Sequence, residues 1–259
     1  SAIFGGANHI ISGDFDVNAG GANARISGGN FNFIGGGTGI NVDRSKYSSS
    51  VGGYNNDIYS GDYSVIGGGL NNLISGIASD SHVDKVAIVG GEQNKVISAP
   101  YTFIGAGNLN LISGTQSTYA SILAGNNNQI KQSQYSVILG GDNNLINYGN
   151  YALAAGRRSS VQSGHNGAFV LSDSQDAEHQ SSGQNTLNLR FQNGVYVNTN
   201  SGIYVNGNPV ITGASGFLGD TLQTITDRGA TTTNAISIHN SAAGGNPRLS
   251  VGRETSQSI

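Results

Sequence analysis

The sequence predicts an all-β protein built as a parallel β-roll or narrow β-solenoid, with coils of about 16 residues and short interlocking β-hairpins after it. One phrase of apolar, Gly and Asn residues recurs through residues 1–168. One position of every full copy is β-branched, as a stacked strand position favours. Gly and Asn pairs interrupt the copies, and each Gly inside a helix would cost about 1 kcal/mol, so the pattern excludes helical repeats.

The repeat has a nearly constant period. The copies at 63–76 and 135–146 read YSVIGGGLNNLISG and YSVILGGDNNLI, and six of the eight spacings between successive copies are 16 residues. The other two spacings are 22 and 18 residues. Self-similarity at a fixed period is typical of stacked architectures in which each coil contacts its neighbours.

The twelfth position of the repeat is its most regular column. Every member is Ile or Val, whose branched side chains are stiff and suit a pleated strand. We expect this structural repeat column to lie in the second strand of each coil. Its members are Ile26, Val42, Ile58, Ile74, Val96, Ile112, Ile130, Ile146 and Val161.

Each copy contains two expected strands and two turns. Neighbouring side chains of a strand point to opposite faces, so Ser64 and Ile66 are expected inside the roll and Val65 outside. Outward positions of other copies are apolar as well, as at Phe33 and Leu139. A roll with two strands per coil cannot cover this face itself, so the sequence predicts that copies of the chain associate along the first sheet.

The composition excludes several classes of function. The 259 residues include 41 Gly and 3 Pro, and the formal net charge is −3 at pH 7 without a Lys/Arg cluster, so no nucleic acid partner is expected. No apolar run approaches the roughly 18 residues of a membrane helix, so no membrane insertion is expected. The absence of Cys excludes disulfides and thiolate zinc sites, and we expect no cofactor and no metal.

Three segments are expected along the chain. Residues 1–168 form the β-roll. Residues 169–214 contain the alternating stretches TLNLRF, GVYVN, GIYVN and PVIT, which predict thin antiparallel β-hairpins that interleave between chains. Residues 215–259 are expected to begin a further fibre module that is incomplete here. Ser1 falls inside a repeat copy, so we expect the chain to be part of a longer protein.

Two families share these motifs. The SVIGGG and SVILGG cores resemble the heads of trimeric autotransporter adhesins, which are parallel β-rolls assembled as trimers. The stretches HNGAFVLSD (165–173), NTLNLRFQNGVYVNT (185–199) and GIYVNGNPVIT (202–212) resemble the modular tail fibres and receptor-binding fibre proteins of bacteriophages.

The second resemblance implies a homotrimeric fibre of the virion that attaches to the host surface by multivalent contacts. Its implied partners are other copies of itself, a host cell-surface glycan or protein, and other virion tail proteins. The alternative is the head of a bacterial trimeric adhesin at the cell surface. A polysaccharide-degrading tailspike is a third and less favoured hypothesis, because the paired carboxylates that such chemistry needs (Asp57 with Asp62, Asp173 with Asp176) lie in no recognisable cleft. We therefore expect no enzyme activity.

Two recurring motifs have structural interpretations beside their functional ones. The Asn pairs occupy the place where calcium-binding solenoids carry Asp, so we expect structural Asn ladders in the turns. The alternative is a sparse ion site. The aromatic column that opens each copy is expected to seal the edge of the roll as a ladder. The alternative is a stacking platform for sugars.

Receptor contacts are expected where the repeat is interrupted or where an aromatic residue lies off its column. Tyr54, Tyr59 and Tyr148 are off-column and should face solvent. The insertion at 77–84 should project from a turn and carries Asp80, His82 and Asp84, which form either a binding patch or a solvated loop. The candidate receptor-contact residues are Tyr54, Tyr59, Asp80, His82, Asp84 and Tyr148.

Overall fold

The computed structural model describes residues 1–76, 83–200, 203–206 and 208–211. The chain divides into two compact units, Ser1–Val195 and Tyr196–Ile259. The described residues contain no helix. The expected fibre module at 215–259 lies outside the described residues.

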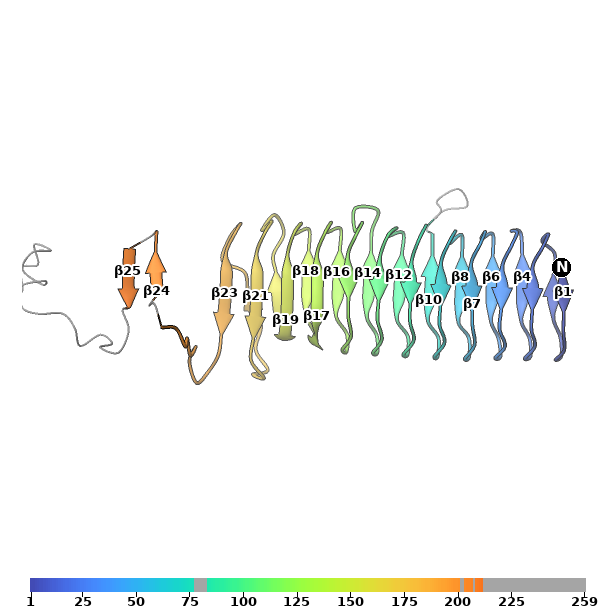
Figure 1. Cartoon of the computed structure of the whole chain (residues 1–259), viewed down its shortest axis with the longest axis horizontal. Helices are drawn as coiled ribbons and strands as arrows, with labels where there is room; N and C mark the ends of the chain where they lie inside the picture. The colour runs from blue at the N-terminus through green and yellow to red at the C-terminus, as the bar shows by residue number, and fades with distance from the viewer. Residues whose placement is uncertain (77–82, 201–202, 207, 212–259) are drawn as a thin grey trace, which may run out of the picture. The chain divides into compact units, whose positions relative to one another are not determined.

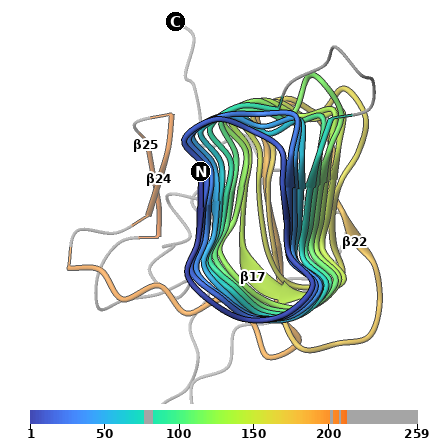
Figure 2. The ribbon, with the colours of Figure 1, turned by 90° about the vertical axis from the view of Figure 1, so that its right-hand side faces the viewer.

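The first unit is a parallel β-solenoid of about 11 turns with coils of about 16 residues, as predicted (Figure 1). Every coil contributes one strand to each of two sheets, so odd-numbered strands form the first sheet and even-numbered strands the second. Viewed along its axis, the roll shows successive coils superposed on one another, with the two sheets facing across a narrow interior (Figure 2).

The strands of the roll are short. The first sheet contains β1 (Ala2–Ile3), β3 (Val17–Asn18), β5 (Phe33–Ile34), β7 (Ser49–Ser50), β9 (Val65–Ile66), β11 (Ala87–Ile88), β13 (Phe103–Ile104), β15 (Ser121–Ile122), β17 (Val137–Asp142), β19 (Leu153–Arg157), β21 (Phe169–Ser172) and β23 (Leu187–Arg190). The second contains β2 (Ile10–Ile11), β4 (Arg25–Ser27), β6 (Asn41–Asp43), β8 (Asp57–Tyr59), β10 (Leu73–Ser75), β12 (Lys95–Ile97), β14 (Leu111–Ser113), β16 (Gln129–Lys131), β18 (Leu145–Asn147), β20 (Ser159–Val161) and β22 (His179–Gln180).

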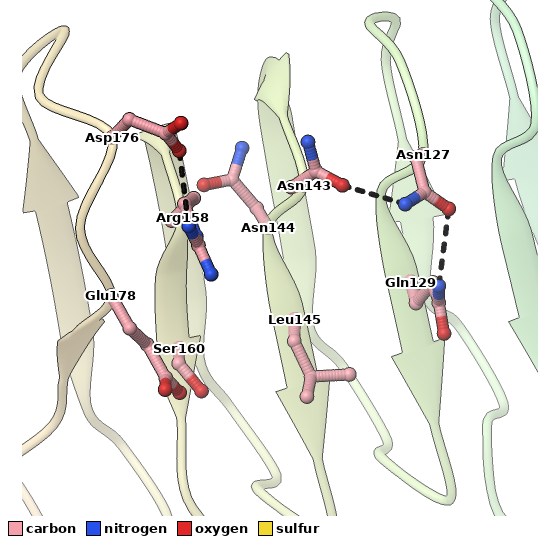
Figure 3. A pocket seen from close by; sticks show the side chains of 9 residues that line it. All are labelled: Asn127, Gln129, Asn143, Asn144, Leu145, Arg158, Ser160, Asp176 and Glu178. Carbon is pink, nitrogen blue, oxygen red and sulfur yellow. Dashed lines mark hydrogen bonds and ion pairs between the residues drawn. The ribbon is translucent and has the colours of Figure 1, made fainter.

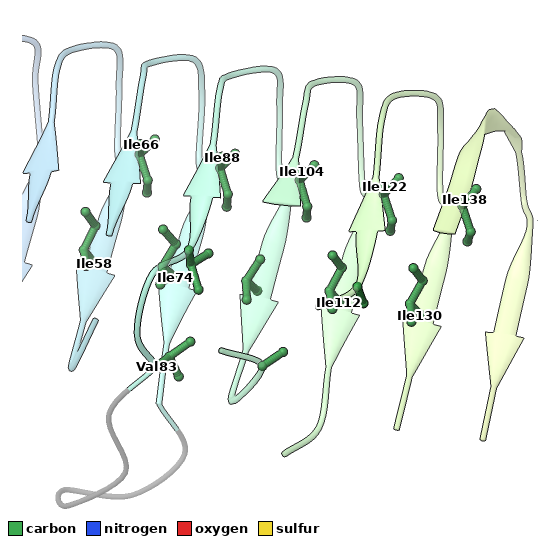
Figure 4. Close-up of a cluster of buried hydrophobic side chains, with 14 of the residues drawn as sticks. Ile58, Ile66, Ile74, Val83, Ile88, Ile104, Ile112, Ile122, Ile130 and Ile138 are labelled. Carbon is green, nitrogen blue, oxygen red and sulfur yellow. The ribbon is translucent and has the colours of Figure 1, made fainter. Parts of the chain in front are cut away.

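The core is a pair of aliphatic columns between the sheets. All nine members of the structural repeat column are fully buried, and in the second sheet Ile74 pairs with Ile58 on one side and Val96 on the other. The inward residues of the first sheet, such as Ile66, Ile88 and Ile104, face them across the interior (Figure 4). Ser64 is also buried and Val65 is exposed, which confirms the predicted alternation.

The coils close through backbone corners with positive φ. Most coils place an Asn or another polar residue at the corner before the second-sheet strand, as at Asn71 (φ 55°). The preceding Gly corner approaches the next coil so closely that a Cβ on Gly69 would collide with the carbonyl oxygen of Gly91. Because L-residues other than Gly and Asn disfavour this region, a coil this short selects a sequence rich in both.

A ladder of buried Asn residues joins the coils beside these corners. The Nδ2 group of Asn72 donates to Asn56 Oδ1 (3.1 Å) and to the carbonyl oxygens of Gly68 and Gly91 (3.0 Å each). In turn, the backbone N–H of Asn94 donates to Asn72 Oδ1 (3.0 Å). The carboxamide of Asn72 thereby bonds to its own turn and to both neighbouring coils, and every ladder member bonds at least to its own turn and the following coil, which confirms the predicted ladder. Its members are Asn56, Asn72, Asn94, Asn110, Asn128 and Asn144.

The roll extends beyond its predicted end at residue 168. Strands β21 and β23 continue the first sheet in parallel, with Phe169 opposite Leu187, and β22 continues the second. The stretch at 186–191 therefore does not form the predicted hairpin, and 194–198 forms no strand. The prediction failed because inward positions such as Ser172 and Asn188 are polar there. In the second unit, β24 (Ile203–Val205) and β25 (Asn208–Ile211) do pair antiparallel, as predicted.

The buried column makes a testable contribution to stability. Replacing Ile112 with Ala removes buried methyl groups and leaves a cavity between the sheets, so the free energy of unfolding should fall by about 2 to 5 kcal/mol. Urea denaturation of the variant measures the loss. Leu109→Ala serves as the control, because Leu109 is 44% exposed at a corner of the roll and its truncation should cost much less. Equal losses in the two variants would contradict the assignment of the core.

Candidate functional site

The outward surface of the second sheet carries a polar groove of about 430 Å³ near the C-terminal end of the roll (Figure 3). Two rows of side chains form it. One row comes from the left-handed corners before the strands, as at Asn127 (φ 50°) and Asn143 (φ 57°), and the other from outward strand positions, as at Leu145. The residue between the rows points inward, as Asn144 does, so a gutter remains between them. The lining residues are Asn127, Gln129, Asn143, Asn144, Leu145, Arg158, Ser160, Asp176 and Glu178.

The corner row is linked along the roll by hydrogen bonds and ion pairs. Asn127 Nδ2 donates to Asn143 Oδ1 (2.6 Å), and Gln129 Nε2 donates to Asn127 Oδ1 (3.2 Å). At the far end, Asp176 pairs with Arg158 Nη1 (3.0 Å) and with Arg157 Nη2 (3.1 Å). Figure 3 shows Glu178 pointing toward Ser160 at the foot of the groove.

The Arg190 side chain fixes the loop at 173–178 that ends the groove. Its Nε donates to Asp173 Oδ1 (3.2 Å), Nη1 to the carbonyl oxygen of Ala177, and Nη2 to that of Gln175 (3.3 Å). The guanidinium suits this role because its donors are held in a rigid plane. The backbone N–H of Gln192 and the guanidinium of Arg190 lower the pKa of Asp173 below its ordinary value, so this carboxylate stays charged.

A chain of hydroxyl groups closes the end of the roll behind the groove. Ser159 Oγ donates to the carbonyl oxygen of Ala155 (2.7 Å) and lies 2.7 Å from Ser172 Oγ, which lies 3.0 Å from His179 Nδ1. Because the carbonyl oxygen of Ala155 can only accept, Ser159 donates to it, and Ser172 is then the donor to Ser159. His179 Nδ1 completes this chain, which caps the core at the end of the roll.

The six candidate receptor-contact residues do not gather at one place. Tyr54 and Tyr148 are each 51% exposed, as predicted, but they lie at opposite ends of second-sheet strands. Tyr59 is only half exposed, because its neighbours in the sheet, Asp43 and Ser75, flank it on both sides, and burial raises the pKa of its hydroxyl. Asp84 is partly buried. Asp80 and His82 lie outside the described residues.

The aromatic column is a ladder and cannot be a sugar platform along its length. Its rings stack with centroids about 5 Å apart, so each ring covers the face of the next and leaves only its edges to solvent. Lys85 interrupts the column, and its Nζ lies 4.6 Å from the centroid of Tyr101. The two stacks contain Phe15, Phe31, Tyr47 and Tyr63, and Tyr101, Tyr119, Tyr135 and Tyr151.

The outer face of the first sheet is apolar and exposed. We define this apolar face as the two outward positions of each coil in that sheet. Twelve strands spaced by about 4.8 Å make it about 50 Å long. Its most exposed members are Phe4, Phe33, Val51, Val65, Val89, Leu123, Leu139, Phe169, Leu187 and Leu189.

The carboxylates proposed as pairs have separate partners. Asp57 accepts a hydrogen bond from Asn41 Nδ2 (2.7 Å), whereas Asp62 accepts one from the backbone N–H of Lys46 (2.8 Å). Asp173 and Asp176 pair with different arginines. In the part of the chain that the structure describes, no three His, Cys, Asp or Glu side chains gather to hold a metal ion.

No protein-family model matches this chain, and no curated protein matches it in a sequence search. Within the described ranges there is no helix with the length and apolar character needed to cross a membrane.

The sequence interpretation missed the groove because no local signal marks it. The charged residues at this end of the roll are spread over positions 157–190, and charges are no denser there than at 43–62.

The clamp, by which we mean the hydrogen bonds of Arg190 to the 173–178 loop, should be required for the fixed position of that loop. Arg190→Lys keeps the charge beside Asp173, but its single nitrogen cannot reach the separate acceptors that Nε, Nη1 and Nη2 of Arg190 contact, so amides of residues 174–178 should exchange with deuterium faster. Arg158→Lys is the matched control, because the Arg158 side chain is exposed and its ion pair with Asp176 survives as a point-charge contact. Unchanged exchange in Arg190→Lys would contradict the clamp.

Acid should loosen the same end of the roll. Burial, followed by the charge of Arg190, lowers the pKa of His179, so the folded chain favours neutral imidazole. Stability from this group is complete above the unfolded pKa of about 6.5 and is lost as the pH falls below it. The protection of residues 159–190, corrected for the slower intrinsic exchange of amides at lower pH, should therefore decrease between pH 7 and pH 5, and His179→Gln should reduce that dependence. The same decrease in His179→Gln would rule out this residue as the cause.

Proposed function

We propose that this chain is a structural and receptor-engaging segment of a trimeric bacteriophage tail fibre, which mediates attachment to the host surface by multivalent contacts. The observation that supports the proposal is the apolar face. Soluble monomers rarely expose contiguous apolar patches above a few hundred Å², so a face about 50 Å long is expected to be covered. The two sheets of the roll already use their inward sides, and a second copy offers the same face.

The distribution of large side chains along the apolar face suits parallel copies. In β5, β9 and β13 the first outward residue is large and the second is Gly (Phe33 and Gly35, Val65 and Gly67, Phe103 and Gly105). In β7, β11 and β15 the order is reversed (Ser49 and Val51, Ala87 and Val89, Ser121 and Leu123). Each of these coils therefore presents one large side chain. Copies related by rotation about an axis parallel to the roll have the same coils at the same height. The large side chain of one copy therefore lies level with the same side chain of the next copy.

The number three comes from the resemblance to trimeric fibres and adhesin heads. Three rolls around one axis would bury each apolar face and leave the second sheets, with their polar grooves, facing outward. A rigid rod that displays three equal surfaces gains avidity without any new contact, provided that all three can reach the host surface. This arrangement assigns assembly to the first sheet and recognition to the second.

The head of a bacterial trimeric adhesin is the second candidate. The part of the chain that resembles adhesin heads is the roll itself, and its apolar face would serve the same purpose there. The flanking sequence separates the two, since an adhesin requires secretion and an outer-membrane anchor, whereas a fibre requires virion genes beside it.

Association along the apolar face can be measured by light scattering. The wild-type chain should give three times the chain mass of 26.5 kDa. A double variant, Val65→Asp with Leu123→Asp, should be a folded monomer, because association of the apolar faces would bury two unpaired carboxylates. Leu111→Asp on the outward side of the second sheet is the control and should stay trimeric. A wild-type monomer under native conditions, or a trimeric double variant, would refute the proposal.

A further inference from the structure

We propose that the polar groove beside the 173–178 loop binds an extended carbohydrate chain that runs along the roll. This inference rests on the proposed receptor-engaging function, and it assigns that function to a site and a ligand class. The groove lies on the sheet that association would leave free.

The side chains of the groove have the chemistry that recognises neutral polyhydroxyl compounds. Asn127, Gln129 and Asn143 each donate one amide N–H to a neighbour and keep a second N–H and a carbonyl lone pair, which match the mixed donor and acceptor character of sugar hydroxyls. The Glu178 carboxylate is an acceptor for two hydroxyl donors, and such charge-assisted bonds are about twice as strong as neutral ones. Leu145 supplies an apolar surface for the C–H face of a sugar ring.

The charges in the groove favour an uncharged ligand over an anion or a cation. Arg158 is already neutralised by Asp176, which also contacts Arg157. An anionic ligand would have to displace Asp176 and would be repelled by Glu178. A cation would be repelled by the two arginines. Hydroxyl groups meet neither obstacle.

The groove has the repeat of a polymer site. A second hollow of about 410 Å³ occupies the same two rows of side chains in earlier coils, where Asn55, Asn71 and Gln93 take the corner positions and Leu73 a strand position. Within each hollow the corner row offers amide groups at the coil spacing of about 4.8 Å, and Leu109 and Leu111 separate the two hollows. A linear polymer laid along either hollow can therefore repeat its contacts from coil to coil.

The C-terminal part of the groove is the part that is preformed. Arg190 holds the 173–178 loop by its bonds to Asp173, Gln175 and Ala177, and the ion pairs of Asp176 hold the loop against Arg157 and Arg158. The loop ends the gutter and gives it a wall. A wall fixed before binding reduces the entropy lost on association.

The test uses the full chain and an immobilised array of defined oligosaccharides from bacterial capsules and lipopolysaccharides. The wild type should bind at least one neutral oligosaccharide, with titration calorimetry confirming the affinity in solution. Glu178→Gln should weaken that binding at least tenfold, and Leu145→Arg, whose long side chain fills the gutter, should abolish it. Asp14→Asn makes the same chemical change on an exposed side chain outside both hollows and should bind as the wild type does.

Three results would overturn the inference: no binding to any oligosaccharide, wild-type affinity in both groove variants, or competition at the groove by a host protein alone. Light scattering on the same samples separates this outcome from the proposed assembly. A trimer that binds no sugar leaves the shaft function intact and removes the groove assignment. A monomer that binds sugar through Glu178 does the reverse.

Discussion

The buried Asn ladder, which runs from Asn56 to Asn144, is the interaction on which the central coils of the roll depend. A coil with strands of two or three residues has few inter-strand hydrogen bonds of its own, and its turns would leave polar groups unpaired in the interior. The carboxamide of Asn110 bonds to Asn94 Oδ1 in the preceding coil, to Ala106 O in its own turn and to Gly125 O in the following coil. One side chain thus satisfies the turn and sets the register of three successive coils, and the fully buried isoleucines then stack without slipping.

The remaining features follow from stacking coils this small. The corners need positive φ, which accounts for the abundance of Gly and Asn, and even the aromatic column accepts it, as at Tyr135 (φ 52°). A non-Gly residue in this region costs roughly 1 to 2 kcal/mol. Stacking on the rings of the neighbouring coils offsets part of that cost, at about 0.5 to 1.5 kcal/mol per aromatic pair. The interior holds only one layer of side chains from each sheet, so the outer apolar face of the first sheet cannot be covered from within the roll.

The roll could be predicted from the sequence because each coil repeats the same local residue preferences. The β-branched column, the alternation around Ile66 and the Asn pairs each follow from the preferences of single residues. The end of the roll was missed because Ser159 and His179 continue the Asn column with different side chains, so the pattern disappears while the backbone pairing persists. The groove was missed for a related reason. Arg190 contacts a loop more than ten residues earlier, and such tertiary contacts have no periodic signature.

The most direct test of this account is NMR measurement of side-chain amide exchange in the Asn residues. The Nδ2 protons of buried Asn94, Asn110 and Asn128 should be strongly protected, because opening them requires separation of adjacent coils. Those of exposed Asn143, at the corner beside the ladder, should exchange rapidly. Equal exchange in the two groups would contradict the claim that the ladder holds the coils in register.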